Sequence, residues 1–460
     1  MNWKVNFKKK NSIDFWLIYI AFALIIGLQA YFYRESTCIM DNAYYLFDMI
    51  NREAFTIPHN RFLAVFAEYL PWLAIQLHLP LKWVLIGFSI NFLVTTYLIF
   101  LIVWKQTKDI TNGYLLLLSA IFLCHHQLFF RSPEYIAIPI CFWFYISLQQ
   151  LNIHKNLFNY LQSFVLLFIL VWGAHTLIYI IVLYVLLLNL YQKENERKRS
   201  FGFIIFFFLI IFLKKKLVPI NGYEQTKIDI FYNSLAHWKD IQKSNFLYFF
   251  REVYRMNYFY NLTNYILLIS VILAIYKRRF VEILWAILFV AGLFFINSIM
   301  FLEENNTYMH YDLYFYMISS IVLLFYYQNI SHSIVLKRFS AVYFMFLVVF
   351  FLIQTSDYFK SRYDYLEQIL LSSHKSKMAI EAKQLNWYKL SNSWAIDVET
   401  IFISSLNGKT KTLYPIENTK NLYTEDSTLI FSTFKNHKSE NLNKVYFNLP
   451  DEKYSVCNIK

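Results

Sequence analysis

Long apolar runs separated by short polar turns follow one another along most of the chain. The first run covers residues 13–33, and further runs continue as far as residue 355. A hydrocarbon core about 30 Å thick requires about 20 predominantly apolar residues per helix, which is the length that these runs supply. The pattern predicts an all-α polytopic membrane domain over residues 1–355. The first run is long and has no small-residue cleavage site, so we expect it to remain as an anchor.

Basic residues in the turns indicate how this domain is oriented. Lysines precede the first run, and basic residues fill the turns at residues 105–108, 192–200 and 277–279. Cytoplasmic loops are enriched in these residues, so the N-terminus and these turns are expected in the cytoplasm. Keeping the later basic turns on that side requires the short run FGFIIFFFLIIFL to cross, which gives eleven spans. The predicted external parts are the loops 34–80 and 214–258 and the C-terminus.

The last part of the chain, residues 356–460, is more polar and has a different pattern. It begins with the helical stretch YLEQILLSSHKSKMAIEAKQL. Alternating apolar and polar residues then predict strands in AIDVETIFISS, STLIFSTF and KVYFNLP. We therefore expect a small external α/β or α+β domain.

Composition excludes several classes of function. The chain is 58% hydrophobic and only 16% charged, which is too apolar for a single soluble core. Its net charge of +13 lies largely in short turns, so no nucleic-acid partner is implied. The four cysteines lack zinc-site or disulfide-scaffold spacing. Walker A, GxSxG, HExxH and GxGxxG patterns are absent, so nucleotide-binding, serine-hydrolase and zinc-protease chemistry have no support.

The loop after the first run holds the principal candidate for chemistry, in the stretch MDNAYYLFDMINREAFTIPHNRF at residues 40–62. Asp41 begins an amphipathic pattern that also contains Asp48 and is typical of a helix lying on the bilayer surface. At or near the N-cap, its carboxylate would be stabilised by free backbone N–H groups. An Asp just outside a span is most often a solvated helix cap that takes no part in catalysis. Residues 61–79 predict a second interfacial helix.

Other predicted external turns also contain ionisable residues. Those that we single out are Arg61, His126, Arg131, Glu134, His175, Lys214, Lys215, Arg251 and Arg255. Ionisable groups at membrane turns mark functional sites more often than chance. Each also has a structural explanation, because Glu134 could cap a helix and the lysines could snorkel or contact anionic headgroups.

In this arrangement the chain resembles the bacterial glycosyltransferases of the GT-C fold, which use polyprenyl-phosphate-linked sugars. The resemblance rests on Asp41 in the first loop, the interfacial helices after it, the Arg-x-x-Glu turn at 131–134, His175 and the soluble tail. It implies sugar transfer to a glycan, lipid or protein acceptor during cell-envelope polysaccharide biosynthesis. The expected location is the bacterial inner membrane, with the C-terminal domain periplasmic.

The resemblance also implies roles for single residues. Asp41 would be the general base, and Glu134 would orient the acceptor or a metal. The departing phosphate or other parts of the substrate would contact Arg61, His126, Arg131, His175, Lys214, Lys215, Arg251 and Arg255. No acidic residue adjoins Asp41, unlike in many relatives, so a divalent metal is left open and no other cofactor is implied.

Two alternatives remain open. An O-antigen polymerase or ligase also acts on external glycans and commonly uses Arg residues in large external loops, as Arg251 and Arg255 would allow. A transporter or flippase of lipid-linked glycan would not be an enzyme. It would need charged or broken helices near the membrane midplane, whereas ionisable residues here are nearly confined to the ends of the runs.

Overall fold

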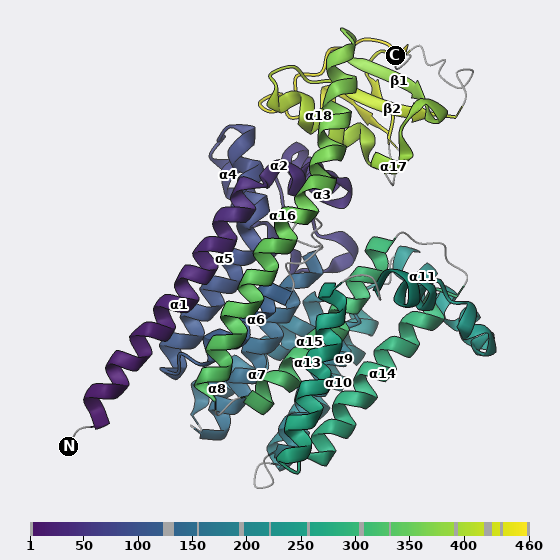
Figure 1. Cartoon of the computed structure of the whole chain (residues 1–460). Helices are drawn as coiled ribbons and strands as arrows, with labels where there is room; N and C mark the ends of the chain where they lie inside the picture. The colour runs from purple at the N-terminus through teal and green to yellow at the C-terminus, as the bar shows by residue number, and fades with distance from the viewer. Residues whose placement is uncertain are drawn as a thin grey trace.

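The computed structural model of the chain is a bundle of helices with a small C-terminal region at one end (Figure 1). The structure describes residues 3–122, 133–153, 156–192, 197–219, 222–254, 258–302, 308–330, 333–390, 394–417, 426–432 and 436–457. Among these residues, four helical segments are long and apolar enough to cross a membrane: Ile13–Tyr31 in α1 (Trp3–Tyr31), α5 (Leu81–Thr107), α14 (Phe280–Met300) and α16 (Ile334–Ser372). The chain is a multi-pass membrane protein, as predicted.

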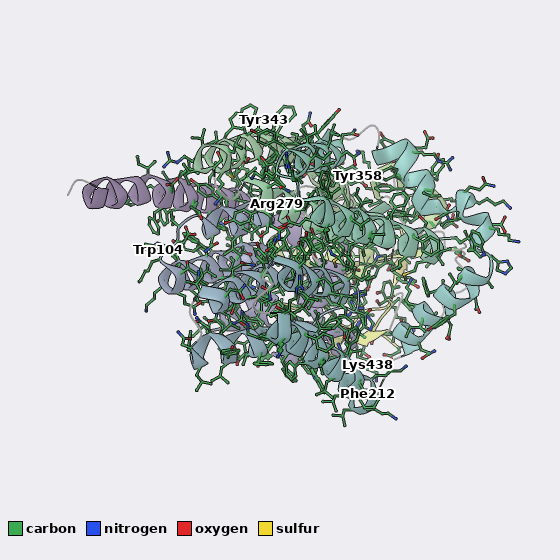
Figure 2. All side chains as sticks on the ribbon, turned by 90° about the horizontal axis from the view of Figure 1, so that it is seen from below. Trp104, Phe212, Arg279, Tyr343, Tyr358 and Lys438 are labelled. Atoms are coloured by element: carbon green, nitrogen blue, oxygen red, sulfur yellow. The ribbon has the colours of Figure 1, made fainter. Side chains whose placement is uncertain are left out.

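Further helices complete the bundle around these four segments. They are α6 (Asn112–Phe122), α7 (Ala137–Ile153), α8 (Leu157–Gly173), α9 (Ile178–Gln192), α13 (Tyr258–Tyr276) and α15 (Tyr308–Ile330). Apolar side chains also project outward, and Phe212 and Tyr343, at 58% and 45% exposed, stand at the periphery in Figure 2. An apolar outer surface is favourable when the surrounding medium is hydrocarbon.

Helix α10 (Arg197–Leu217) contains the short seventh run. It is one continuous helix of 21 residues, with basic residues at both ends, and it packs against α8 and α9. A helix of that length extends about 30 Å, but its flanking residues are mostly basic, and α10 is not among the four described segments that are apolar enough to cross. The count of eleven crossings stays a prediction. The loop after α10 contains α11 (Gly222–Ala236), η5 (Trp238–Lys243), α12 (Asn245–Phe249) and η6 (Phe250–Tyr254).

The first predicted external loop is helical, as expected from its amphipathic pattern. It contains α2 (Tyr33–Thr37), α3 (Met40–Arg52), η1 (Pro58–Asn60) and α4 (Ala64–Gln76). The N-cap residue of α3 is Ile39, and Asp41 lies one position inside the helix, in its first turn. A side chain from the C-terminal region bonds the first N–H of α3 instead, because the backbone N–H of Met40 donates to Glu399 Oε1.

The C-terminal region is joined to the bundle by a single helix. α16 runs without a break for 39 residues across the predicted boundary after residue 355. A parallel sheet in the order β2-β1-β5 follows, formed by β1 (Lys377–Glu381), β2 (Thr412–Ile416) and β5 (Ser455–Val456). The remaining elements include α17 (Trp387–Leu390), α18 (Ile396–Leu406) and an antiparallel pair, β3 (Leu429–Ile430) and β4 (His437–Lys438). The sheet and helices agree with the coarse expectation of a small mixed region.

Several predictions within this region are wrong in detail. The predicted helix at 365–385 ends at Ser372, and its second half contains β1. The segment AIDVETIFISS forms α18 and not a strand, whereas KVYFNLP contains no strand among its described residues. In α18 the polar positions are buried together with the apolar ones, because Glu399 pairs with Arg362 and Thr400 Oγ1 accepts a hydrogen bond from Leu413 N. Alternation along this segment therefore does not mark two faces of a strand.

The orientation of the bundle gives a testable prediction. A reporter fused after Ser373, at the end of α16, should be active only outside the cytoplasm, because the basic turns favour the cytoplasmic face. A fusion after Thr107, at the end of α5, should show the opposite behaviour. Measuring both fusions with reporters specific for each compartment checks the orientation, and cytoplasmic activity of the Ser373 fusion would invert it.

Candidate functional site

One face of α3 is turned away from the protein core. Asp41, Tyr44, Tyr45 and Asp48 are half-buried, whereas the positions between them, such as Phe47, are buried. Residues three and four apart share one helical face. From the C-terminal region, the Trp394 ring meets Tyr44 edge to face, with the ring centroids 5.9 Å apart. The acidic face of α3 therefore lies where the bundle meets the C-terminal region.

The two carboxylates on this face have different surroundings. Asp48 Oδ1 lies 2.7 Å from Arg52 Nε in an ion pair. Asp41 forms no hydrogen bond or ion pair within the part of the chain that the structure describes, and burial raises its pKa from 3.8 to about 6. A desolvated carboxylate without a partner is less stable when ionised, which makes it a stronger proton acceptor near neutral pH.

A cationic cluster, consisting of His59, Arg61, His175 and Lys214, lies at the same end of the bundle. Its members come from the segment before α4, the turn between α8 and α9, and the end of α10. The backbone N–H of Leu63 donates to Gly173 O at 3.1 Å and joins the first two segments. A Cβ at position 173 would lie only 3.2 Å from Leu63 Cγ, so glycine permits this approach.

Lys214 is held against the end of α8. Its Nζ donates to the carbonyl oxygens of Val171 and Ala174, at 3.2 and 3.4 Å, and to the hydroxyl of Tyr179 at 3.1 Å. A lysine at this place also complements the negative end of the helix dipole. These hydrogen bonds account for the position of Lys214 without a ligand. They also hold its ammonium group at the His175 turn rather than in lipid.

The imidazole of His175 interacts electrostatically with the other members of the cluster. Its Nδ1 accepts a hydrogen bond from Leu177 N at 3.1 Å, which assigns the proton of the neutral ring to Nε2. Burial lowers the pKa of His175 well below its usual value, and the charges of Arg61, Lys214 and His59 lower it further. A bound anion would offset this electrostatic repulsion and favour protonation of His175.

The backbone around His59 is strained. His59 and Asn60 have φ values of 54° and 60°, in the left-handed region that residues other than glycine seldom adopt. The side chain of Asn60 donates to Pro219 O at 3.5 Å and ties this turn to the segment after α10. Strained backbone of this kind clusters at binding and catalytic sites.

The other predicted site residues are less closely associated with this cluster. Lys215 is exposed on α10, and Arg251 is exposed and donates to the carbonyl oxygens of Leu247 and Gln242. Glu134 belongs to η3 (Pro133–Ile136), which packs against α4, but its side chain lies outside the described part. His126, Arg131 and Arg255 also lie outside the described residues. The structure thus brings together Arg61, His175 and Lys214. Asp41 lies at the same end of the bundle, but within the described ranges it forms no hydrogen bond or ion pair with them.

Glu68 in α4 is a polar residue of this region that sequence reasoning did not select. It is 1% exposed, its Oε2 accepts a hydrogen bond from Thr56 N at 2.8 Å, and its Oε1 has no hydrogen-bond partner among the described residues. Burial raises its pKa to about 8, and nearby Asp48 adds to this effect. In the sequence, the only indication is a glutamate within an apolar helical segment. Its burial beside α3 becomes visible only in the fold.

Metal ligation remains open at this end of the bundle. Within the described ranges, no group of three or more His, Cys, Asp or Glu side chains is arranged to hold a metal ion. The side chains of Glu134 and His126 lie outside the described part of the structure. The residues that are described supply positive charge and an isolated carboxylate, which suit an anionic ligand better than a cation.

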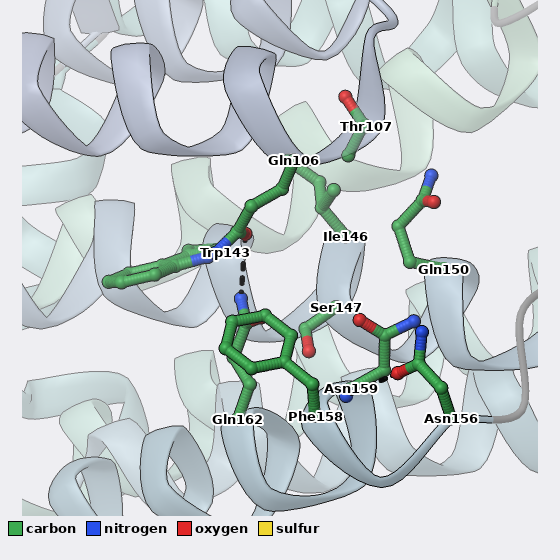
Figure 3. A pocket seen from close by; sticks show the side chains of 10 residues that line it. All are labelled: Gln106, Thr107, Trp143, Ile146, Ser147, Gln150, Asn156, Phe158, Asn159 and Gln162. Carbon is green, nitrogen blue, oxygen red and sulfur yellow. Dashed lines mark hydrogen bonds between the residues drawn. The ribbon is translucent and has the colours of Figure 1, made fainter.

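A cavity of about 190 Å³ lies at the opposite end of α5, α7 and α8 (Figure 3). Its lining includes Trp143, Ser147 and several side-chain amides, and Gln162 Nε2 donates to Gln106 Oε1 at 3.0 Å. All lining residues are uncharged. This cavity therefore lacks the charge that a phosphate would require, and it is remote from α3 along the helices.

The fold defines a helical, multi-pass membrane protein, and Arg61, His175 and Lys214 lie together at the end of the bundle that carries α3. Comparisons with models of known protein families, with curated proteins and with solved structures give no match for the chain.

Proposed function

We propose that the protein is an integral membrane glycosyltransferase. It would transfer a sugar from a polyprenyl-phosphate-linked donor to a glycan, lipid or protein acceptor at the external face of the membrane. The convergence of Arg61, His175 and Lys214 at the bundle end that carries Asp41 is the observation that supports this function best. A cationic site for a phosphate and a desolvated base are the parts that such a reaction needs.

The proposed reaction is one displacement at the anomeric carbon of the donor. The acceptor hydroxyl oxygen forms the new bond to this carbon while the bond to the phosphate oxygen breaks and its electron pair leaves with the phosphate. Asp41 takes the hydroxyl proton. Arg61, Lys214 and the Nε2–H of His175 would donate hydrogen bonds to the departing phosphate, which gains negative charge as the bond breaks. Attack from the side opposite the phosphate inverts the configuration.

The position of the cluster favours a lipid-linked donor. Lys214 follows the apolar part of α10, and His175 follows α8, so both would lie close to the membrane surface. A donor with a polyprenyl chain presents its phosphate at that depth, whereas a water-soluble nucleotide sugar would require a phosphate-cradling loop, and no such motif occurs in the sequence.

The direct test is turnover by the purified protein in lipid nanodiscs. Polyprenyl-phosphate-linked sugars would be supplied with glycan, glycolipid or peptide acceptors, and release of polyprenyl phosphate would be measured. Donor consumption that requires an acceptor supports a glycosyltransferase. Use of a diphosphate-linked oligosaccharide alone would indicate a polymerase or ligase, and movement of intact donor across vesicles without release would indicate a transporter.

The surroundings of His175 predict how donor affinity varies with pH. A bound phosphate diester should raise the pKa of His175, so the complex takes up a proton that the free protein does not hold. Affinity should therefore increase as pH falls from about 7.5 to about 5.5, a range in which the diester itself does not titrate. Binding measured over this range with wild-type protein and with His175→Gln provides the comparison. An equal pH dependence in both proteins would exclude this role for His175.

A further inference from the structure

Glu399 of the C-terminal region is buried at the start of α3. It is 0% exposed, and its Oε1 accepts hydrogen bonds from the backbone N–H of Met40 at 2.7 Å and from Arg362 Nη2 at 2.8 Å. Arg362, which is 2% exposed on α16, also donates through Nε to Glu399 Oε2 at 3.0 Å. One carboxylate thus connects α16, α18 and the first residue of α3.

The start of α3 requires such an external partner. The first N–H groups of a helix have no partner within the helix, and the N-cap residue Ile39 has no side chain that could accept a hydrogen bond. Met40 has φ of 40°, in the left-handed region that is unfavourable for a residue with a side chain. Backbone strain at such a residue persists only where surrounding contacts hold it. The residue that follows Met40 is Asp41.

We propose that Glu399 is a positioning residue for Asp41. The Asp41 carboxylate forms no bond of its own to the described residues, so its direction is set by the backbone of the first turn of α3. Glu399 holds that turn in place, and the C-terminal region thereby becomes part of the catalytic unit. This inference rests on the proposed role of Asp41 in the glycosyltransferase reaction.

The C-terminal region is built to hold Glu399 rigidly. α18 packs against both α3 and α16, and α16 enters the region without a flexible linker. Thr400, the residue after Glu399, accepts a hydrogen bond from Leu413 N at 3.0 Å and joins α18 to β2. The position of the Glu399 carboxylate is therefore fixed by the bundle and by the sheet.

Two variants of the full-length protein separate positioning from general stability. Glu399→Gln keeps an oxygen that can accept the Met40 N–H but leaves Arg362 buried without its counter-ion, so it should lose stability and retain most turnover. The double variant Glu399→Leu with Arg362→Met removes both charges and fills the space with apolar atoms, which commonly preserves stability. It leaves Met40 N–H without a partner and should lower kcat by about 10- to 100-fold, with KM for the donor nearly unchanged.

The decisive result is how the two variants rank in thermal stability and in turnover. Positioning predicts that the double variant is the more stable and the less active of the two, in thermal unfolding and in turnover. If turnover instead follows stability, so that the double variant is as active as the wild type, Glu399 has only a structural role.

A readout that does not depend on activity separates this inference from the proposed function. Failure of the wild type to turn over any lipid-linked sugar would contradict the proposed function alone. Positioning would then be tested by modifying Asp41 with a water-soluble carbodiimide over a pH series and quantifying the Asp41 peptide by mass spectrometry. The double variant should shift the pH midpoint of labelling downward as the turn opens to water, and Glu399→Gln should not. Identical labelling curves for the wild type and the double variant would overturn the inference.

Discussion

Replacement of Asp41 by Asn is expected to abolish nearly all sugar transfer while the protein folds and inserts normally. Asn has almost the same size and shape but cannot take up the proton of the acceptor hydroxyl. A positioned base contributes about 100- to 10,000-fold to the rate, so the loss should fall in this range. Turnover is measured as release of polyprenyl phosphate from a labelled donor.

The same variant should also be more stable than the wild type. Burial raises the pKa of Asp41 from 3.8 to about 6. The contribution of this group to the free energy of unfolding is therefore fully present below pH 3.8 and is lost as the pH rises through 6. Above this range the ionised carboxylate costs up to about 3 kcal/mol, which Asn would remove. We therefore expect a higher thermal unfolding midpoint for Asp41→Asn near neutral pH, and a smaller difference near pH 4.

Asp48→Asn is the matched control. Asp48 lies on the same face of α3 but is already paired with the exposed Arg52, so its removal should change turnover by no more than a few fold. If Asp41→Asn retains wild-type turnover, Asp41 has no role as a base, and the proposed mechanism is wrong.

Replacement of Arg61 by Gln is expected to have the second largest effect. Arg61 is 9% exposed, and its charge acts on His175 in the cationic cluster. A hydrogen bond to a charged group contributes about 1.5–3 kcal/mol. The dissociation constant for polyprenyl phosphate should therefore increase by about 10- to 150-fold, and its dependence on salt concentration should weaken.

Lys215→Gln is the matched control for Arg61. It removes one positive charge from the same end of the bundle, but Lys215 is exposed on α10, so affinity should change little. Lys214 is a less suitable choice, because its Nζ also bonds Val171 O and Tyr179, and its loss would disturb the α8–α9 turn. Equal affinities of Arg61→Gln and Lys215→Gln would show that the cluster does not hold the phosphate.

The helical bundle could be predicted from the sequence because its signal is local. The apolar runs at residues 81–104, 157–172, 177–191 and 280–300 predict α5, α8, α9 and α14 to within three residues at each end, and the amphipathic pattern predicts α3. The C-terminal region was harder, since the polar residues of α18 are buried by partners distant in the chain. Glu399 meets Met40 across 359 positions of sequence, and no local pattern reveals such a contact.

The candidate site could be predicted only as a set of residues on one side of the membrane. Their association depends on tertiary contacts, such as the bond between Leu63 N and Gly173 O, which brings the Arg61 segment to the His175 turn. The same limit applies to Glu68, because the burial of a glutamate in an apolar helix depends on the neighbouring elements and not on the local sequence. Lys214 bonds Val171 O and Tyr179, whereas Lys215 is exposed. This difference follows from the packing of α10 against α8 and cannot be predicted from three consecutive lysines.

The most direct test of the account is an experimental structure of the protein in nanodiscs with a non-hydrolysable phosphonate analogue of a polyprenyl-phosphate-linked sugar. We predict that phosphonate oxygens lie about 2.7–3.2 Å from donor nitrogens of Arg61, His175 or Lys214, with the Asp41 carboxylate facing the anomeric carbon from the opposite side. Binding of the analogue away from these residues, or with Asp41 separated from the sugar by the protein, would contradict the proposed site.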